Sequence, residues 1–480
     1  YSLGNNSGTA LADCPCLAHL NRLILKKSRT SEQAGKALAQ SPHLEGLTGL
    51  HIEGGSLADQ ALAALASSST FSSLTTLTLA ELSLSNVPRA LETWLIHSPI
   101  TSLRVNLIGA FAYFYTRGLL ASEGLKRLTS LDLSGTKLLR SRARAIAIDY
   151  APNLRSLVLS RCQIDAEGMT SLLRESTLDR LESLDLGWND LATSSTIREL
   201  STSQSFPKPT SLKAQSIGLQ DEHLGTLLNG LLCPQLEKLD LGYNPLTADG
   251  LRHFENNASV QNLKSLSLWD VSLGDSGALM LSRAPFQNLT SLSLNEADLS
   301  TPGIKALTES LCSLEHFSAT KSRIDDSSLA ILCSKDGMAR LRELGLWDNA
   351  VTAQGVAALT RAPFAGTLRS LNLSENHIGD DGVEQIAASE MRQLRDLRLM
   401  DVGLSDSGVI ALMRSPVLSS LENLDLRLSI LSDVAVQAII DSPYLNNLNS
   451  LRLWGPHLTE EMRLSLRARF SSQGTMLWLR

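Results

Sequence analysis

Leucine recurs along this 480-residue chain in a six-residue frame, Leu-x-x-Leu-x-Leu. Clear copies are LESLDL at 181–186, LKSLSL at 263–268 and LRSLNL at 368–373. With degenerate copies included, the frame occurs 17 times, and successive first leucines are 25 to 28 residues apart. Alternate residues of a β-strand point to opposite faces. Each frame therefore predicts a short strand whose second and third leucines point into a core, while the residues between them point outward.

The second half of each repeat has the pattern of an amphipathic helix. Segment 405–416, SDSGVIALMRSP, begins with Ser and Asp, which are capping residues, continues with apolar residues, and ends around Pro416. Proline precedes the next frame by one to five residues nine times, and it cannot continue a helix. We therefore expect a helix in each repeat that ends near such a proline. Similar helical segments occupy 301–310, 352–363 and 379–389.

A strand and a helix in about 27 residues, repeated in register along nearly the whole chain, resemble the leucine-rich-repeat family, and in particular its ribonuclease-inhibitor-like subtype. Glycines at several helix starts also look like bacterial repeat proteins of this subtype. The resemblance implies an α/β horseshoe-shaped solenoid with a parallel sheet on the concave face and helices on the convex face. It also implies one solenoid domain, with an N-terminal partial repeat at 1–19, repeats over 20–457 and a C-terminal cap at 458–480.

The frame departs from the family pattern at one position. The family usually has Asn or Cys three residues after the third leucine, where the side chain bonds to the backbone of the turn. Turns without such a residue must find other hydrogen-bond partners. Asn189, Asn244, Asn349, Asn376 and Cys162 follow the pattern, whereas Leu82, Ile217, Val271, Ala297, Val402 and Pro456 do not.

The net charge and the cysteine content narrow the range of functions and cellular settings that we expect for the chain. The net charge is −6, which argues against a general binder of nucleic acids or anionic membranes, and no run of 18 apolar residues predicts a membrane span. The six cysteines are too scattered for a disulfide framework, so we expect reduced thiols and a cytoplasmic setting. Cys14-Pro15-Cys16 resembles a metal or redox motif. Because it aligns with Ser-Pro-His at 41–43, we interpret it as a variant of the repeat.

No catalytic pattern stands out in the sequence. It has no metalloprotease motif, no phosphate-binding loop and no dinucleotide-binding turn, and its nine histidines lack metal-ligand spacing. We therefore expect no enzymatic activity, no cofactor and no metal site. Aspartates recur at position five of the frame, counted from its first leucine, and we expect them to be solvated. They are Asp132, Asp185, Asp240 and Asp425.

Aromatic residues concentrate at two frame positions. Trp269, Trp347 and Trp454 stand at position seven, and Trp188 and Tyr243 stand at position eight. Together with positions three and five, these positions should face the concave side, where tryptophan is typical of binding hot spots. The alternative is that each ring lies over the neighbouring repeat and only shields it. Ten repeat steps separate the outermost tryptophans, roughly 50 Å at the usual strand spacing, which favours a protein or long peptide over a small molecule.

Across repeats nine to fifteen, acidic residues outnumber basic ones at these positions, which favours a basic partner. The alternative is a solvated face that has no partner. We therefore predict a non-enzymatic, monomeric scaffold that binds a protein on its concave face. The alternative is a regulatory or targeting module of a larger protein whose effector domain lies upstream. An aromatic-rich segment at 109–118 is interpreted as core, with a lateral binding site as its alternative. The predicted partner-binding residues are Trp188, Tyr243, Trp269, Asp270, Glu296, Glu343, Trp347, Asp348, Glu375, Asp396, Arg398, Asp401 and Trp454.

Overall fold

In a computed structural model, the chain divides into two compact units, Tyr1–Asp240 and Leu241–Arg480. The predicted aromatic segment at 109–118 lies outside the described residues. The continuity of one solenoid across both units stays a prediction. The structure describes residues 5–27, 29–54, 56–82, 87–107, 123–138, 151–175, 178–191, 193–203, 209–231, 233–334, 338–429, 431–454, 458–471 and 473–479.

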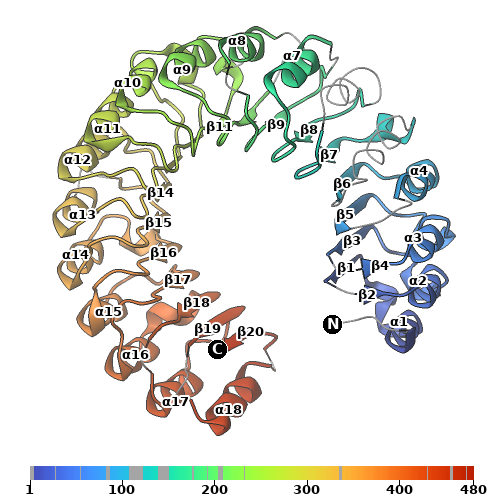
Figure 1. Cartoon of the computed structure of the whole chain (residues 1–480). Coiled ribbons are helices and arrows are strands. Elements are labelled where there is room, and N and C mark those ends of the chain that lie inside the picture. Colours follow the sequence, from blue (N-terminus) through green and yellow to red (C-terminus); the bar gives the residue numbers. More distant parts are fainter. Residues whose placement is uncertain are drawn as a thin grey trace. The chain divides into compact units, whose positions relative to one another are not determined.

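In the first unit, parallel strands pair so that equal frame positions stand side by side. Leu157 is in register with Leu184, and Leu184 with Leu212. Helices lie on the outer side of this sheet (Figure 1). The strands are β1 (Arg22–Lys26), β3 (Gly49–Glu53), β5 (Thr76–Leu82), β6 (Ser102–Leu107), β7 (Ser130–Asp132), β8 (Ser156–Val158), β9 (Ser183–Asp185), β10 (Ser211–Lys213) and β11 (Lys238–Asp240), and β2 (Arg29–Thr30) pairs separately with β4 (Ser56–Leu57). The helices are α1 (Asn5–Ala12), α2 (Glu32–Ala39), α3 (Asp59–Ala66), α4 (Val87–His97), α7 (Ala166–Glu175), α8 (Ser194–Thr202) and α9 (Asp221–Leu228).

The second unit repeats the arrangement, with Leu292, Phe317 and Leu344 in register on neighbouring strands. Its helices again cover the outer side of the sheet (Figure 1). The strands are β12 (Ser265–Ser267), β13 (Ser291–Ser293), β14 (His316–Ser318), β15 (Glu343–Gly345), β16 (Ser370–Asn372), β17 (Asp396–Arg398), β18 (Asn423–Leu426), β19 (Ser450–Leu453) and β20 (Met476–Leu479). The helices are α10 (Ala248–Leu251), α11 (Gly274–Ser282), α12 (Thr301–Ser310), α13 (Asp326–Leu332), α14 (Ala353–Leu359), α15 (Gly379–Ala387), α16 (Asp406–Met413), α17 (Asp433–Asp441) and α18 (Glu460–Ser471).

The core has the predicted composition. The second and third leucines of the frame are buried; Leu266 and Leu268 are 1% and 0% exposed. The predicted helix at 405–416 is present as α16, and Ser405 caps it by accepting a hydrogen bond from the Ser407 N–H. Pro416 begins a 3₁₀ turn that leads to the next frame. Parallel strands inside and helices outside in both units confirm the predicted fold class.

Asparagine three residues after the third leucine links neighbouring turns, as expected. The Asn189 side-chain oxygen accepts from the backbone N–H groups of Cys162 and Ile164, both at 3.1 Å. At Ala297, where the family residue is missing, the turn has another side-chain partner. The Ala297 N–H donates to Ser322 Oγ at 3.2 Å. The predicted substitute partner is therefore confirmed at Ala297, while Pro456 lies outside the described residues.

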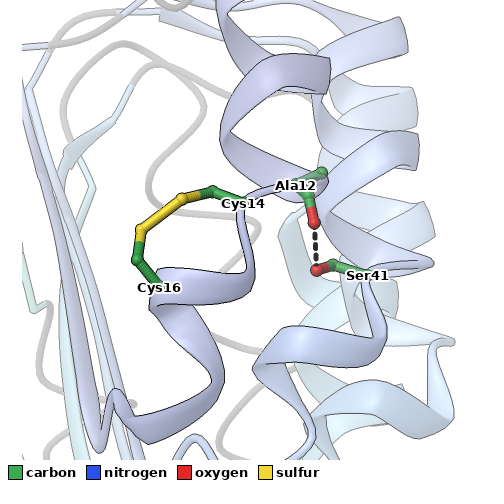
Figure 2. The surroundings of a disulfide bond; sticks show 4 residues. All are labelled: Ala12, Cys14, Cys16 and Ser41. Atoms are coloured by element: carbon green, nitrogen blue, oxygen red, sulfur yellow. Dashed lines mark hydrogen bonds between the residues drawn. A yellow bond between two sulfur atoms is a disulfide. The ribbon is translucent and has the colours of Figure 1, made fainter.

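The prediction of reduced thiols was wrong for one pair: Cys14 and Cys16 form a disulfide (Figure 2). Pro15 begins a 3₁₀ turn that brings the two Cα atoms to 5.3 Å, within the range that a disulfide requires. Pro42 begins the equivalent turn in the next repeat, so the motif does occupy the predicted repeat position. In Figure 2, Ser41 Oγ donates to the Ala12 carbonyl at 2.5 Å and joins the end of α1 to the start of the Pro42 turn.

Aspartates at the starts of five helices of the second unit each join their helix to the next one, and they were not predicted from the sequence. The Asp380 carboxylate accepts from Ser405 N at 2.9 Å, Ser405 Oγ at 2.5 Å and Ser407 Oγ at 2.6 Å. Burial raises the pKa of Asp380, but these hydrogen bonds outweigh it and hold the pKa below its usual value. We call this series the aspartate ladder. Its other steps join Asp275 to Ser300, Asp326 to Thr352, Asp406 to Ser432 and Asp433 to Thr459.

We expect Asp380→Asn to destabilise the protein by about 1–2 kcal/mol at pH 7, because a neutral amide accepts these hydrogen bonds less strongly. Since the folded-state pKa lies below the unfolded value of about 3.9, the contribution is complete above that value and is lost as pH falls through the folded-state pKa. Urea unfolding of both proteins from neutral to acidic pH measures this difference. Asp381→Asn changes an exposed neighbour and should leave stability nearly unchanged. An equal loss in both variants would contradict the ladder.

Candidate functional site

Position eight of the frame has the left-handed backbone conformation in one repeat after another. Its N–H donates to the carbonyl of position seven in the next repeat, as from Tyr243 to Trp269 at 2.6 Å and from Asp348 to Ser374 at 2.9 Å. This backbone costs a residue other than glycine about 1–2 kcal/mol, yet large and charged side chains occupy it. The φ angles are 61° at Trp188, 57° at Tyr243, 53° at Asp270, 58° at Glu296, 51° at Lys321, 53° at Asp348, 53° at Glu375 and 52° at Asp401.

Two predicted aromatic residues meet at this edge of the second unit. The rings of Tyr243 and Trp269 lie 5.6 Å apart and are tilted by 36°, and Trp269 is 38% exposed. Gly242 permits this approach, since a Cβ there would lie 3.0 Å from the Trp269 carbonyl oxygen and 3.2 Å from its Cβ. The pair therefore presents an aromatic surface to solvent.

The other tryptophans differ in how far their own chain covers them. The Lys321 ammonium lies 4.9 Å from the ring centre of Trp347, whose buried Nε1 has no hydrogen-bond partner among the described residues. In the first unit, the Arg161 guanidinium lies 4.2 Å from the ring centre of Trp188. Trp454 is 38% exposed. Trp347 thus fits the predicted packing alternative in part, whereas Trp188, Trp269 and Trp454 are each 38% exposed and remain accessible.

Acidic side chains line position eight of the second unit, a set we call the acidic row. Lys321 stands among them and stacks on Trp347. None of the row's carboxylates forms an ion pair with a described residue, so each remains available to a partner. The acidic row consists of Asp270, Glu296, Asp348, Glu375 and Asp401.

Three further predicted residues lie on the strands themselves and are already paired. His316 Nδ1 lies 3.0 Å from a Glu343 carboxylate oxygen, and Arg398 Nε lies 2.8 Å from Asp396. Between these pairs the inner surface has a hollow of about 360 Å³. This hollow was not predicted from the sequence, although short side chains at position five of four successive repeats signal it. These are Ser293, Ser318, Gly345 and Asn372.

The prediction that the position-five aspartates are solvated was wrong for Asp425. Asp425 is only 4% exposed, and the Arg427 side chain binds its carboxylate through Nε at 2.9 Å and Nη2 at 2.7 Å. Burial raises the pKa of Asp185, and the nearby carboxylates of Asp132 and Asp240 add to the rise. Short acidic side chains are covered here by longer neighbours, which a single strand pattern does not reveal.

Among the described residues, no three His, Cys, Asp or Glu side chains are grouped so as to hold a metal ion. Within the same residues, no helix has the length and apolar character needed to cross a membrane.

Comparison with known proteins gives matches along the chain. The family described as Leucine Rich repeat matches residues 150–173, 233–254 and 367–387. Ribonuclease inhibitor from Sus scrofa is 29% identical over 260 residues, which cover 51% of this chain and 56% of that protein. NACHT, LRR and PYD domains-containing protein 5 from Bos taurus is 29% identical over 265 residues, covering 48% of this chain and 22% of that protein. The match thus spans about half of the first relative and about a fifth of the second.

Among solved structures, the yeast complex of Rad7 and Elc1 contains a chain that aligns with a TM-score of 0.48 at 17% identity. The alignment covers 79% of this chain and 85% of that one. At this TM-score the likeness adds nothing to the sequence relationships.

Trp347 and Trp269 are covered to different degrees by their own chain, and this predicts different effects on stability when each is replaced. Trp347→Ala should cost about 1 kcal/mol more stability than Trp269→Ala, because Trp347 is the more buried ring and also loses its contact with Lys321. Urea unfolding of the two variants at the same pH measures this difference. If Trp269→Ala were the more destabilising change, its ring would be a packing element instead of an accessible surface.

Proposed function

We propose that the chain, which matches the leucine-rich-repeat family over three segments and resembles ribonuclease inhibitor, is a non-enzymatic scaffold that binds a protein or long peptide on the inner face of its repeats. The observation that carries the proposal is the edge of the second unit at positions seven and eight. Exposed aromatic rings and unpaired carboxylates lie there on successive strands, on a backbone held by one hydrogen bond per repeat.

The surface is large enough for a macromolecule. From Trp269, next to β12, to Trp454, next to β19, the strands make seven steps of about 4.8 Å, or roughly 34 Å. Aromatic side chains provide rigid contact area at little cost in conformational entropy. A partner that lies along this edge would contact several repeats at once.

The acidic row indicates a basic partner. A Lys or Arg side chain placed beside Asp270 and Glu296 would also reach the Tyr243–Trp269 pair, so carboxylates and aromatic rings would bind the same cation. The complementary charges would speed association and make the affinity fall as salt rises. We therefore propose a basic protein segment as the ligand of this edge.

Affinity capture from a lysate of the source cell tests the proposal. The wild-type bait is compared with the triple variant Trp269→Ala, Asp270→Asn and Glu296→Gln. The specific partner should be retained at least tenfold less by the variant, and its retention by the wild type should fall as salt is raised.

A matched control variant removes the same charge and a similar exposed apolar area, but from the outer helices. It carries Leu279→Ala, Asp381→Asn and Glu384→Gln, and Leu279 is 39% exposed. Circular dichroism verifies that all baits are folded. Equal capture by the wild type and the inner-face variant, or a comparable loss with the outer-face control, would contradict the proposed surface.

A second candidate is a repeat module of a larger protein. The bovine relative carries NACHT and PYD domains in its name besides its repeats, and the matched region is 22% of its length. Reading the genomic frame upstream of Tyr1 tests this candidate. An in-frame domain there would favour the module, and an immediate start codon would favour the stand-alone scaffold.

A further inference from the structure

A polar hollow of about 490 Å³ opens at the opposite edge of the second unit's sheet, where β16 to β19 begin. Arg369, Arg395, Glu422 and Asn449 stand at position two of four successive frames, each directly before its strand. The side chains of Gln393 and Asn447 also line the hollow. Every side chain named here is polar, so the hollow suits a hydrogen-bonding ligand.

One arginine in the hollow has no counter-ion. Arg395 Nη1 lies 3.1 Å from Glu422 Oε1, and on the other side Arg342 Nε lies 3.4 Å from Glu315 Oε2. Arg369 stands between these pairs, and among the described residues it forms no ion pair. Two arginines against one glutamate leave the hollow with one net positive charge.

The backbone fixes these side chains at regular spacing. The Arg369 carbonyl accepts from Arg395 N at 2.8 Å and from Asp396 N at 3.1 Å, and the Arg395 carbonyl accepts from Glu422 N at 2.8 Å. Neighbouring position-two residues are therefore about one strand spacing apart, roughly 4.8 Å. A ligand would meet a guanidinium and side-chain amides whose Cα positions are already in place, which lowers the entropic cost of binding.

We propose that this hollow binds a carboxylate from an acidic side chain of a protein partner, with Arg369 as its main contact. A guanidinium matches a carboxylate in planar geometry and donates two parallel hydrogen bonds to it. The chain as a whole carries a net charge of −6, so an acidic ligand gains nothing from general electrostatic attraction. Binding of such a ligand requires a local site of this kind. The hollow is separate from the acidic row, and this proposal does not rest on the proposed function.

Fluorescence anisotropy of a rhodamine-labelled hexaglutamate peptide, titrated with the full chain at low salt, tests the proposal. Arg369→Gln should weaken binding at least tenfold, because it removes a charge-assisted bidentate contact. Arg361→Gln is the matched control, since it removes the same charge from an exposed side chain just beyond the outer helix α14. It should change the affinity less than twofold. A hexaglutamine peptide should not bind.

Asn449→Asp provides a second variant of nearly unchanged size, in case Arg369→Gln fails to fold as judged by circular dichroism. It places a carboxylate in the hollow and should also weaken binding at least tenfold. Equal losses in Arg369→Gln and Arg361→Gln, or no loss in either hollow variant, would overturn the site. Displacement of the peptide by inorganic phosphate at concentrations where acetate has no effect would assign the hollow to phosphate and overturn the carboxylate proposal.

Discussion

In-register hydrogen bonding between neighbouring strands is the constraint on which each unit depends. At one step, the Arg342 carbonyl accepts from both Arg369 N and Ser370 N, at 2.7 and 3.0 Å, and the same geometry recurs along the sheet. Because no register shift occurs between β12 and β20, residues at equal frame positions form continuous rows. The leucine rows become the core, and the rows at positions two, seven and eight become the two edges.

The fold could be predicted from the sequence because each repeat interacts mainly with the repeats next to it. A solenoid has no distant pairing to find, so the six-residue frame, its spacing and its prolines contain the whole local topology. The aspartate ladder was missed for the opposite reason. Its bonds join the helix start of one repeat to that of the next, and Asp380 gives no sign in its own segment that Ser405 lies within reach. The Cys14–Cys16 disulfide depends on the turn that Pro15 begins, which the repeat alignment alone does not fix.

The frame predicted which residues lie on the candidate surface, but it did not predict which neighbouring side chains surround each of them. Frame counting located Trp269 and Trp347 equally well, since both stand at position seven. What separates them is the neighbour: Tyr243 lies beside the first, and Lys321 covers the second. Burial of a side chain on a sheet is decided by the lengths and rotamers of adjacent side chains, and these differ from repeat to repeat. Single-repeat patterns therefore predict where a residue stands without predicting whether a partner can reach it.

The two edges of the second unit's sheet differ in charge, and this difference limits how a partner can dock. The acidic row follows the ends of the strands, whereas Arg369 and its polar hollow precede their beginnings. Six residues separate position two from position eight, which at about 3.3 Å each is at most roughly 20 Å. A partner that satisfied both proposed surfaces would carry a basic segment and an acidic side chain at that separation. Docking in the reverse orientation would place like charges together, so the charge pattern selects orientation even where contact area does not.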